Sequence, residues 1–163
     1  MYEPIRTKSV HTMADPEIPH RSREQELDIR LAGQLTALLT VTDELHALAA
    51  RMGGGGPQDA GVDGAGPDGA ELDGAELDGD GLAAAAERIA EQVARLSGGH
   101  YPLRAEPTDG GAPSRIEALQ QRAHTLAGNA LAVATTRGDE AARELAAERM
   151  AAHATPLRDL ATA

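Results

Sequence analysis

The chain has few side chains that could do acid–base or metal chemistry, and their spacing does not assemble a site. It contains six histidines and no cysteine in 163 residues. No two histidines stand four residues apart, the spacing that places two metal ligands on one helix face. His124 follows a predicted core position, so we interpret it as a hydrogen-bonded structural histidine. We therefore assign no catalytic, cofactor-binding or metal-binding residue.

Nucleophilic and phosphate chemistry have no better candidates. No G-x-S-x-G sequence is present, and the glycine runs lack the Lys-Ser/Thr ending of a phosphate-binding loop. Ser22 and Ser114 are better explained as helix caps, because each stands three residues before a Gln or Glu. The sequence favours a non-enzymatic protein, and an enzyme without a recognisable motif stays an open alternative.

One acidic stretch has the order of residues of a calcium-binding loop. The matching positions are Glu76, Asp78, Asp80, Gly81, Leu82, Ala84 and Glu87. This stretch of twelve residues resembles an EF-hand loop, although Glu76 stands where that family has Asp. The resemblance implies a calcium site. The alternative is a solvated linker, because a repeated DGAEL-like unit produces such acidic pairs by itself.

Apolar residues at helical spacing predict four helices. The first begins after Ser22, and the third begins at Ser114. The second runs from about Leu82 to Leu96 with Asp80 as its cap, and the last runs from about Glu140 to His153 with Pro156 closing it. The stripe of the first helix is Leu31, Leu35, Leu38, Thr42, Leu45, Ala49 and Met52, and that of the third is Ile116, Leu119, Ala123, Leu126, Ala130 and Val133.

These stripes predict an all-α fold, a small antiparallel bundle of three to four helices. We expect residues 1–21 to be a flexible arm and residues 22–163 a single helical domain. A disordered, acidic, Gly-rich linker at 53–81 interrupts that domain. Alanines at stripe positions 86, 123 and 130 predict that the second and third helices pack closely.

A second resemblance to a known family lies in the last two predicted helices. Residues 123–150, AHTLAGNALAVATTRGDEAARELAAERM, join two Ala-rich helices through a Gly-Asp turn. This segment resembles one tetratricopeptide hairpin, which implies protein binding. The alternative is an ordinary helical hairpin, because such folds need about three repeats and the chain has one.

Composition restricts the classes of partner and location. The net charge is −11, but eight acidic and no basic residues lie within 53–81, so the helical part is nearly balanced. The sequence has no concentrated basic face of the kind that would predict nucleic-acid binding, so we expect no nucleic-acid partner. No run of about 18 apolar residues and no signal-like start are present, so we expect a cytoplasmic protein without a membrane anchor.

The core must be built without Phe or Trp. Such a core buries little area per residue, and self-association would relieve that deficit. We therefore expect a non-catalytic protein, regulatory or accessory, that acts through protein–protein contacts with itself or a partner and needs no cofactor. Leu39, Val41 and Leu48 broaden the first helix's apolar face and are the candidate interaction surface, with ordinary core as the alternative. The rival function is a small accessory enzyme or ligand carrier with a pocket near His124 and Tyr101.

Overall fold

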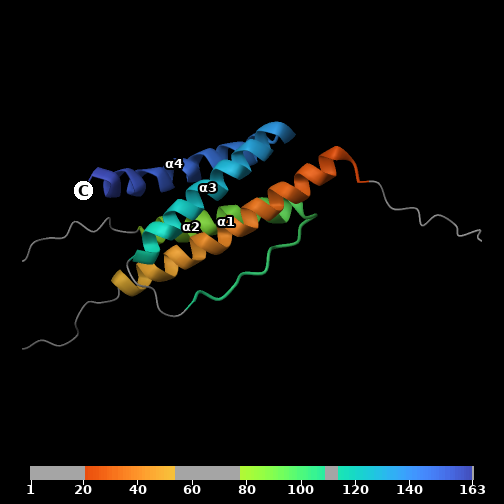
Figure 1. Ribbon diagram of the computed structural model, residues 1–163. Coiled ribbons are helices and arrows are strands. Elements are labelled where there is room, and N and C mark those ends of the chain that lie inside the picture. Colours follow the sequence, from red (N-terminus) through yellow and green to blue (C-terminus); the bar gives the residue numbers. More distant parts are fainter. Residues whose placement is uncertain (1–20, 54–77, 109–113, 163) are drawn as a thin grey trace, which may run out of the picture.

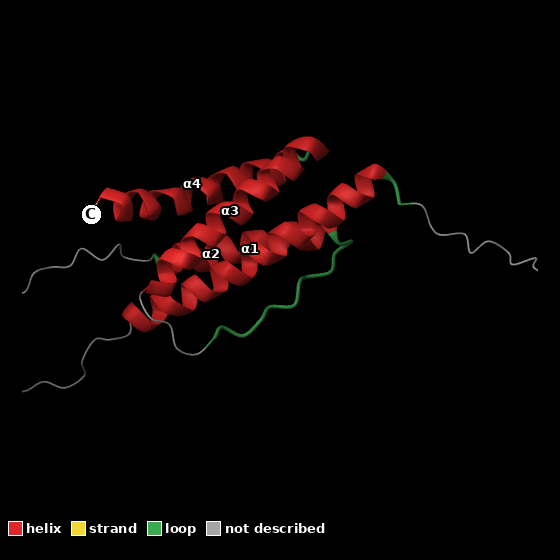
Figure 2. Cartoon of the chain, in the orientation of Figure 1, coloured by secondary structure: helices red, strands yellow, loops and turns green. Residues whose placement is uncertain are grey.

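The computed structural model describes residues 21–53, 78–108 and 114–162. They form four helices, α1 (Arg23–Gly53), α2 (Gly79–Leu96), α3 (Ser114–Arg137) and α4 (Glu140–Thr162). No strand occurs within these ranges (Figure 2). The predicted all-α class is confirmed. Most of the predicted arm at 1–21 and of the predicted linker at 53–81 lies outside the described residues.

Neighbouring helices run antiparallel around the sides of a four-sided bundle (Figure 1). α1 packs against α2 and α3, α3 packs against α4, and α2 touches α4 only thinly. Ion pairs fix the directions: Arg137 reaches Asp28 near the start of α1, whereas Arg115 reaches Glu44 near its end. The bundle is therefore the antiparallel arrangement that the stripes predicted.

The predicted packing of the second helix on the third is wrong. α2 and α3 lie on a diagonal, and in the described part of the chain no Cα atom of one comes within 8 Å of a Cα atom of the other. The physical reason is the connection at 97–108, which returns along α1 and lets α3 begin beside Glu44 of that helix. The small side chains of α3 therefore face α1 and α4 instead.

The first helix begins as the sequence predicted. The Ser22 amide donates to Gln25 Oε1 at 2.9 Å, and the Gln25 amide donates to Ser22 Oγ at 3.2 Å. This reciprocal pair satisfies two amides that an uncapped helix would leave free. α1 then continues through Gly53, one residue into the predicted linker.

The predicted start of the second helix is wrong by three residues. Asp78, not Asp80, is the cap: its Oδ1 accepts the Gly81 amide at 3.0 Å, and α2 begins at Gly79. A Cβ at position 81 would clash with Asp78 Oδ2, so a residue without a side chain allows this carboxylate to fold over the helix end.

The turn between the last two helices matches its prediction, but the end of α4 does not. Gly138 takes a positive φ of 74°, and the Asp139 amide donates to the carbonyl of Ala134 at 3.0 Å, which closes α3. Asp139 Oδ1 then caps α4 by accepting the Ala142 amide at 3.1 Å. α4 runs on through Pro156 to Thr162, since a proline removes one helical hydrogen bond without stopping every helix.

The core combines large leucines on α1 with small alanines on α3 and α4. Its fully buried large side chains are Leu31, Leu35, Leu38, Leu39, Leu45 and Ile89. On α3 the most deeply buried positions are Ala123, Ala127, Ala130 and Ala134. Leu126 and Val133 of the predicted stripe are only partly buried, because α3 packs against α1 on one side and α4 on another.

Candidate functional site

The connection between α2 and α3 is an extended strap, residues 97–108, that lies along α1 and α2 (Figure 1). The turn at Ser97–Gly99 opens it, where two glycines adopt positive φ and the Gly99 amide donates to the Ala94 carbonyl at 2.7 Å. Side chains of an extended segment alternate in direction. Arg104 points toward the helices, so its neighbour Leu103 points away from them.

Arg104 clamps the strap to both helices beneath it. Its Nε and Nη2 donate to the two oxygens of Asp43 on α1 at 3.0 and 2.5 Å, and its Nη1 donates to Glu87 on α2 at 2.5 Å. The hydrogen bonds with Asp43 and Glu87 raise the pKa of Arg104, although its partial burial opposes this. Two-pronged pairing of this kind fixes geometry as well as charge.

A second contact holds the far end of the strap. Glu44 Oε1 accepts both the amide and the hydroxyl of Thr108, at 2.9 and 2.8 Å, and Arg51 donates to the Thr108 carbonyl at 3.1 Å. Burial acts to raise the pKa of Glu44, but the Thr108 hydrogen bonds and the charges of Arg115 and Arg51 outweigh it, so the pKa is lowered. The strap is therefore held at two points four residues apart.

Replacing Arg104 with alanine should release the strap and cost about 1 to 3 kcal/mol of stability, because buried Asp43 loses its partner. Chemical denaturation measures the loss, and faster amide exchange at 100–108 reports the release. Arg143→Ala is the matched control, since Arg143 pairs only within α4 with exposed Glu140. Equal stability and equal exchange in R104A and R143A would contradict the clamp.

The outward side of the strap presents two large apolar side chains. Leu103 is 97 % exposed and Tyr101 is 65 % exposed. Tyr101 is also the single aromatic residue within the described ranges. We call Tyr101 and Leu103 the strap surface. The sequence analysis named Tyr101 as part of a possible pocket but missed Leu103, although the alternating Tyr-Pro-Leu-Arg order was an available signal.

The sequence-predicted interaction surface is corrected by the structure. Leu39 is 1 % exposed, and Val41 and Leu48 are buried with it in the core. The three residues lie in the intramolecular core, which was the alternative stated for them. The physical reason is that α1 has neighbours on two sides, α2 and α3, so its broad apolar face is covered by the same chain.

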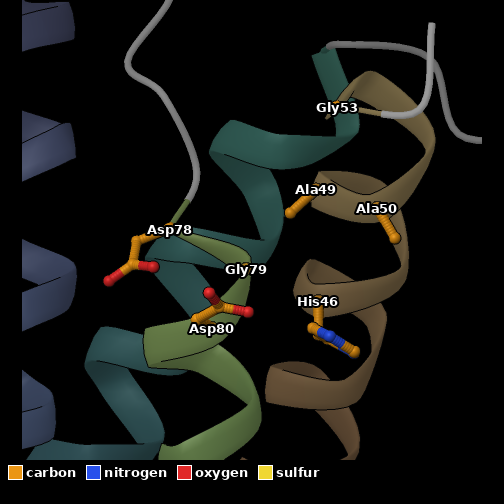
Figure 3. A pocket seen from close by; sticks show the side chains of 7 residues that line it. All are labelled: His46, Ala49, Ala50, Gly53, Asp78, Gly79 and Asp80. Carbon is orange, nitrogen blue, oxygen red and sulfur yellow. The ribbon is translucent and has the colours of Figure 1, made fainter. Parts of the chain in front are cut away.

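A cavity of about 590 Å³ lies where α1 ends and α2 begins. It is lined by His46, Ala49, Ala50, Gly53, Asp78, Gly79 and Asp80. Figure 3 shows the carboxylate of Asp80 and the ring of His46 facing this space from the two helices. The cavity adjoins both ends of segment 54–77, which lies outside the described residues.

The calcium-loop interpretation does not fit this geometry. From Gly79 onward the matching residues are helical, and the Asp78 carboxylate caps Gly81 while Glu87 pairs with Arg104. A helical backbone cannot wrap its side chains around one cation as an EF-hand loop does. Within the described ranges, no group of three His, Cys, Asp or Glu side chains could hold a metal ion.

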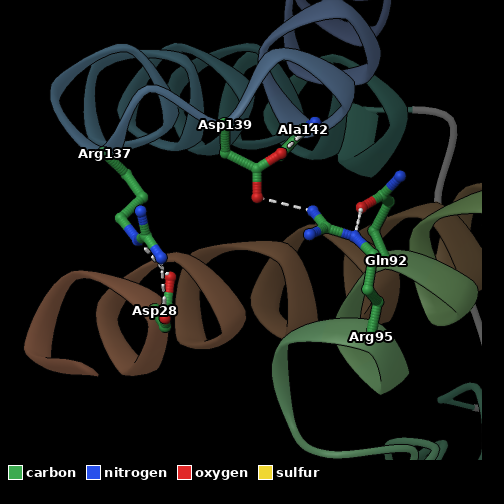
Figure 4. A network of polar contacts seen from close by, with 6 residues as sticks. All are labelled: Asp28, Gln92, Arg95, Arg137, Asp139 and Ala142. Carbon is green, nitrogen blue, oxygen red and sulfur yellow. Dashed lines mark hydrogen bonds and ion pairs between the residues drawn. The ribbon is translucent and has the colours of Figure 1, made fainter. Parts of the chain in front are cut away.

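Polar contacts link residues of all four helices at the opposite end of the bundle (Figure 4). Asp139 is at their centre, accepting from Arg95 of α2 at 2.5 Å as well as capping α4. Burial acts to raise the pKa of Asp139, but these hydrogen bonds and the charges of Arg95 and Arg137 lower it overall. Beside it, Arg137 donates to Asp28 of α1 at 2.7 Å. These contacts fix the helices, and the charged groups of Asp28, Arg95, Arg137 and Asp139 are all engaged in hydrogen bonds.

The histidines of α3 and α4 lie close together, and each makes a hydrogen bond to the other helix. His124 Nδ1 lies 3.0 Å from the Met150 carbonyl, and His153 Nδ1 lies 2.6 Å from Gln120 Oε1. His153 is almost fully buried, and among the described residues its Nε2 has no hydrogen-bond partner. The structural interpretation of His124 therefore agrees with its contacts.

The structure places the two residues of the predicted pocket, His124 and Tyr101, on different elements. Tyr101 lies on the strap over α1 and α2, whereas His124 lies between α3 and α4. Within the described ranges, neither the cavity beside His46 nor a smaller one between α2 and α4 is lined by either residue.

We compared the chain with family models, curated proteins and solved structures. None matches. The tetratricopeptide likeness thus has no support beyond one helical hairpin, α3–α4. Within the described ranges, no helix is both long enough and apolar enough to cross a bilayer.

Proposed function

We propose that this protein is a non-catalytic helical bundle that acts through protein–protein contacts in a regulatory or accessory role. Its first partner is a second copy of itself, and its location is the cytoplasm. The contact surface is the strap surface, Tyr101 and Leu103, in place of the buried leucines of α1.

This proposal rests on one observation: Leu103 and Tyr101 are exposed on a strap that hydrogen bonds hold in place. A scattered exposed leucine is normal on a folded protein. Here, however, the exposed pair lies on a segment whose backbone is held by Arg104 and Thr108. Binding through a segment that is already ordered loses less conformational entropy than binding through a flexible one. Tyrosine is enriched in interfaces and among their energetically dominant residues.

The nature of the core favours a second copy as the partner. The described core contains leucines, valine, isoleucine and alanines but no aromatic side chain. Covering Leu103 and Tyr101 adds apolar burial that the monomer lacks, worth roughly 1.5 to 3 kcal/mol for a fully buried leucine. A symmetric dimer uses such a patch twice, once from each copy.

Leu103→Asp should convert the oligomer to a monomer, because a carboxylate would have to be buried at the contact. Size-exclusion chromatography with light scattering measures the mass at one fixed concentration. Ile29→Asp is the matched control, since Ile29 is another exposed apolar residue, 54 % exposed, on α1. An L103D protein with the mass of the unmodified oligomer would refute the strap surface.

The ligand-carrier alternative is favoured by a different observation, the cavity beside His46. Its volume falls in the range of roughly 300 to 1,000 Å³ that small-molecule sites occupy. A thermal-shift screen tests it: a saturable shift that is lost in His46→Ala would support a ligand carrier. The absence of any His46-dependent shift would count against it.

A further inference from the structure

The side of the bundle between α2 and α4 is built differently from the other three. We call it the seam. Residues of α2 that contribute to it are Arg88, Glu91, Gln92 and Arg95, and those of α4 and its cap are Asp139, Ala141, Glu144, Leu145 and Glu148. All but Ala141 and Leu145 are polar or charged. The contact between the two helices is thin, while the other three neighbouring pairs pack extensively.

The seam also contains empty space. A cavity of about 230 Å³ lies between the two helices, with Glu91 and Glu144 both at its lining. Arg88 lies at the same lining and its charge attracts Glu91, so this space is bordered by charged groups and not by packed apolar side chains. The cavity therefore shows that side chains do not fill the space between α2 and α4.

Two ion pairs bridge this gap. Arg88 donates to both oxygens of Glu148, at 2.8 and 2.7 Å, and Arg95 donates to Asp139 at 2.5 Å. Both members of the first pair are about half exposed to solvent. Exposed pairs of this kind are weak and are screened by salt.

The chain's connections leave the seam free to open. α2 and α4 are not consecutive, and the strap that follows α2 is clamped to α1 and α2. The α1–α2 and α3–α4 pairs are joined through the α1–α3 interface, which is fixed by buried apolar residues and by the Asp28–Arg137 pair.

We propose that the seam is an electrostatic latch. The α3–α4 hairpin pivots about the α1–α3 interface, and the seam opens without unfolding of the bundle when the Arg88–Glu148 and Arg95–Asp139 pairs are neutralised. Opening uncovers the side of α4 that carries Leu145, which is buried in the closed arrangement. The latch does not depend on the proposed self-association, because its residues are separate from the strap surface.

The lack of cysteine allows a direct distance measurement by spin labelling of the full chain. Labels at Ala84→Cys and Ala147→Cys, both exposed, report on α2–α4, and labels at Thr40→Cys and Thr125→Cys report on α1–α3. In Arg88→Glu the α2–α4 pair should gain a longer distance, with the open population rising up to about fivefold for the loss of one exposed pair. Raising the salt concentration should have the same effect. The charge-swapped R88E/E148R protein should return to the short distance.

Each other outcome overturns the proposal. Unchanged α2–α4 distances in R88E and in high salt would show that the ion pairs do not hold the seam. Equal lengthening of the α1–α3 pair would show a general loosening of the bundle. Glu148 also accepts a hydrogen bond from Arg149 at 2.9 Å, so Glu148→Arg alone is measured as the control for the loss of that contact. If R88E/E148R showed as much of the long distance as E148R alone, the pairing of position 88 with position 148 would not hold the seam.

Discussion

Leu39→Ala lowers the free energy of unfolding by about 2 to 5 kcal/mol in our account, because it leaves a cavity at a fully buried position. Small domains are stable by only roughly 5 to 15 kcal/mol, so a large fraction of this protein's stability would be lost. Urea denaturation at a fixed protein concentration measures the change.

The same substitution at an exposed leucine is the control. Leu103→Ala removes the same atoms from a side chain that is 97 % exposed in the single chain, so the stability of the monomer, measured at a protein concentration too low for dimer formation, should change by no more than about 0.5 kcal/mol. Comparing Leu39→Ala with Leu103→Ala also distinguishes a leucine that packs in the core from one that is exposed for contact with a partner. If Leu39→Ala altered the oligomer and left stability intact, Leu39 would be an interaction residue after all.

The second large effect is the pH dependence that His153 causes. Burial, together with the charges of Arg149 and His124, lowers the pKa of His153 from 6.5 to about 4. In the neutral ring, Nδ1 donates to Gln120 Oε1, so protonation would place a proton and a charge on Nε2, for which the described part of the chain supplies no acceptor. Between pH 6.5 and 4 the unfolded chain therefore binds a proton that the folded chain does not.

The sign of the effect follows from this difference. Stability is full above about pH 6.5 and falls as the pH is lowered toward 4, by an amount on the order of 3 kcal/mol for this group. Thermal unfolding at a series of pH values measures it. His153→Gln should remove this part of the pH dependence, and His100→Gln, at an exposed loop position, should retain it. Identical pH profiles for the unmodified protein and H153Q would contradict the assignment.

Local signals in the sequence were enough to predict the helices. The Ser22–Gln25 capping box and the Gly138–Asp139 turn depend on neighbours within five residues, and both formed as expected. The start of α2 was misplaced because Asp78 and Asp80 both suit a cap, and the repeat gave no reason to prefer one. The prediction that Pro156 ends the last helix was wrong, because a proline lowers the stability of a helix but does not always end it.

Packing partners and the site depended on contacts that are distant in sequence. Arg104 pairs with Asp43 across 61 residues, and no pattern near either residue indicated the other. The breadth of the α1 apolar face was detected correctly, but a broad face is produced both by two intramolecular neighbours and by a partner. The structure assigns it to α2 and α3, and the exposed residue that matters in our proposal, Leu103, lies in a loop without periodicity.

Sedimentation equilibrium of the unmodified full chain, over a concentration range from about 1 to several hundred micromolar, tests the central claim most directly. Our account predicts a reversible monomer–dimer equilibrium, and the same series with Leu103→Asp should show monomer throughout. A mass equal to that of one chain for the unmodified protein over the whole range would contradict self-association through the strap surface.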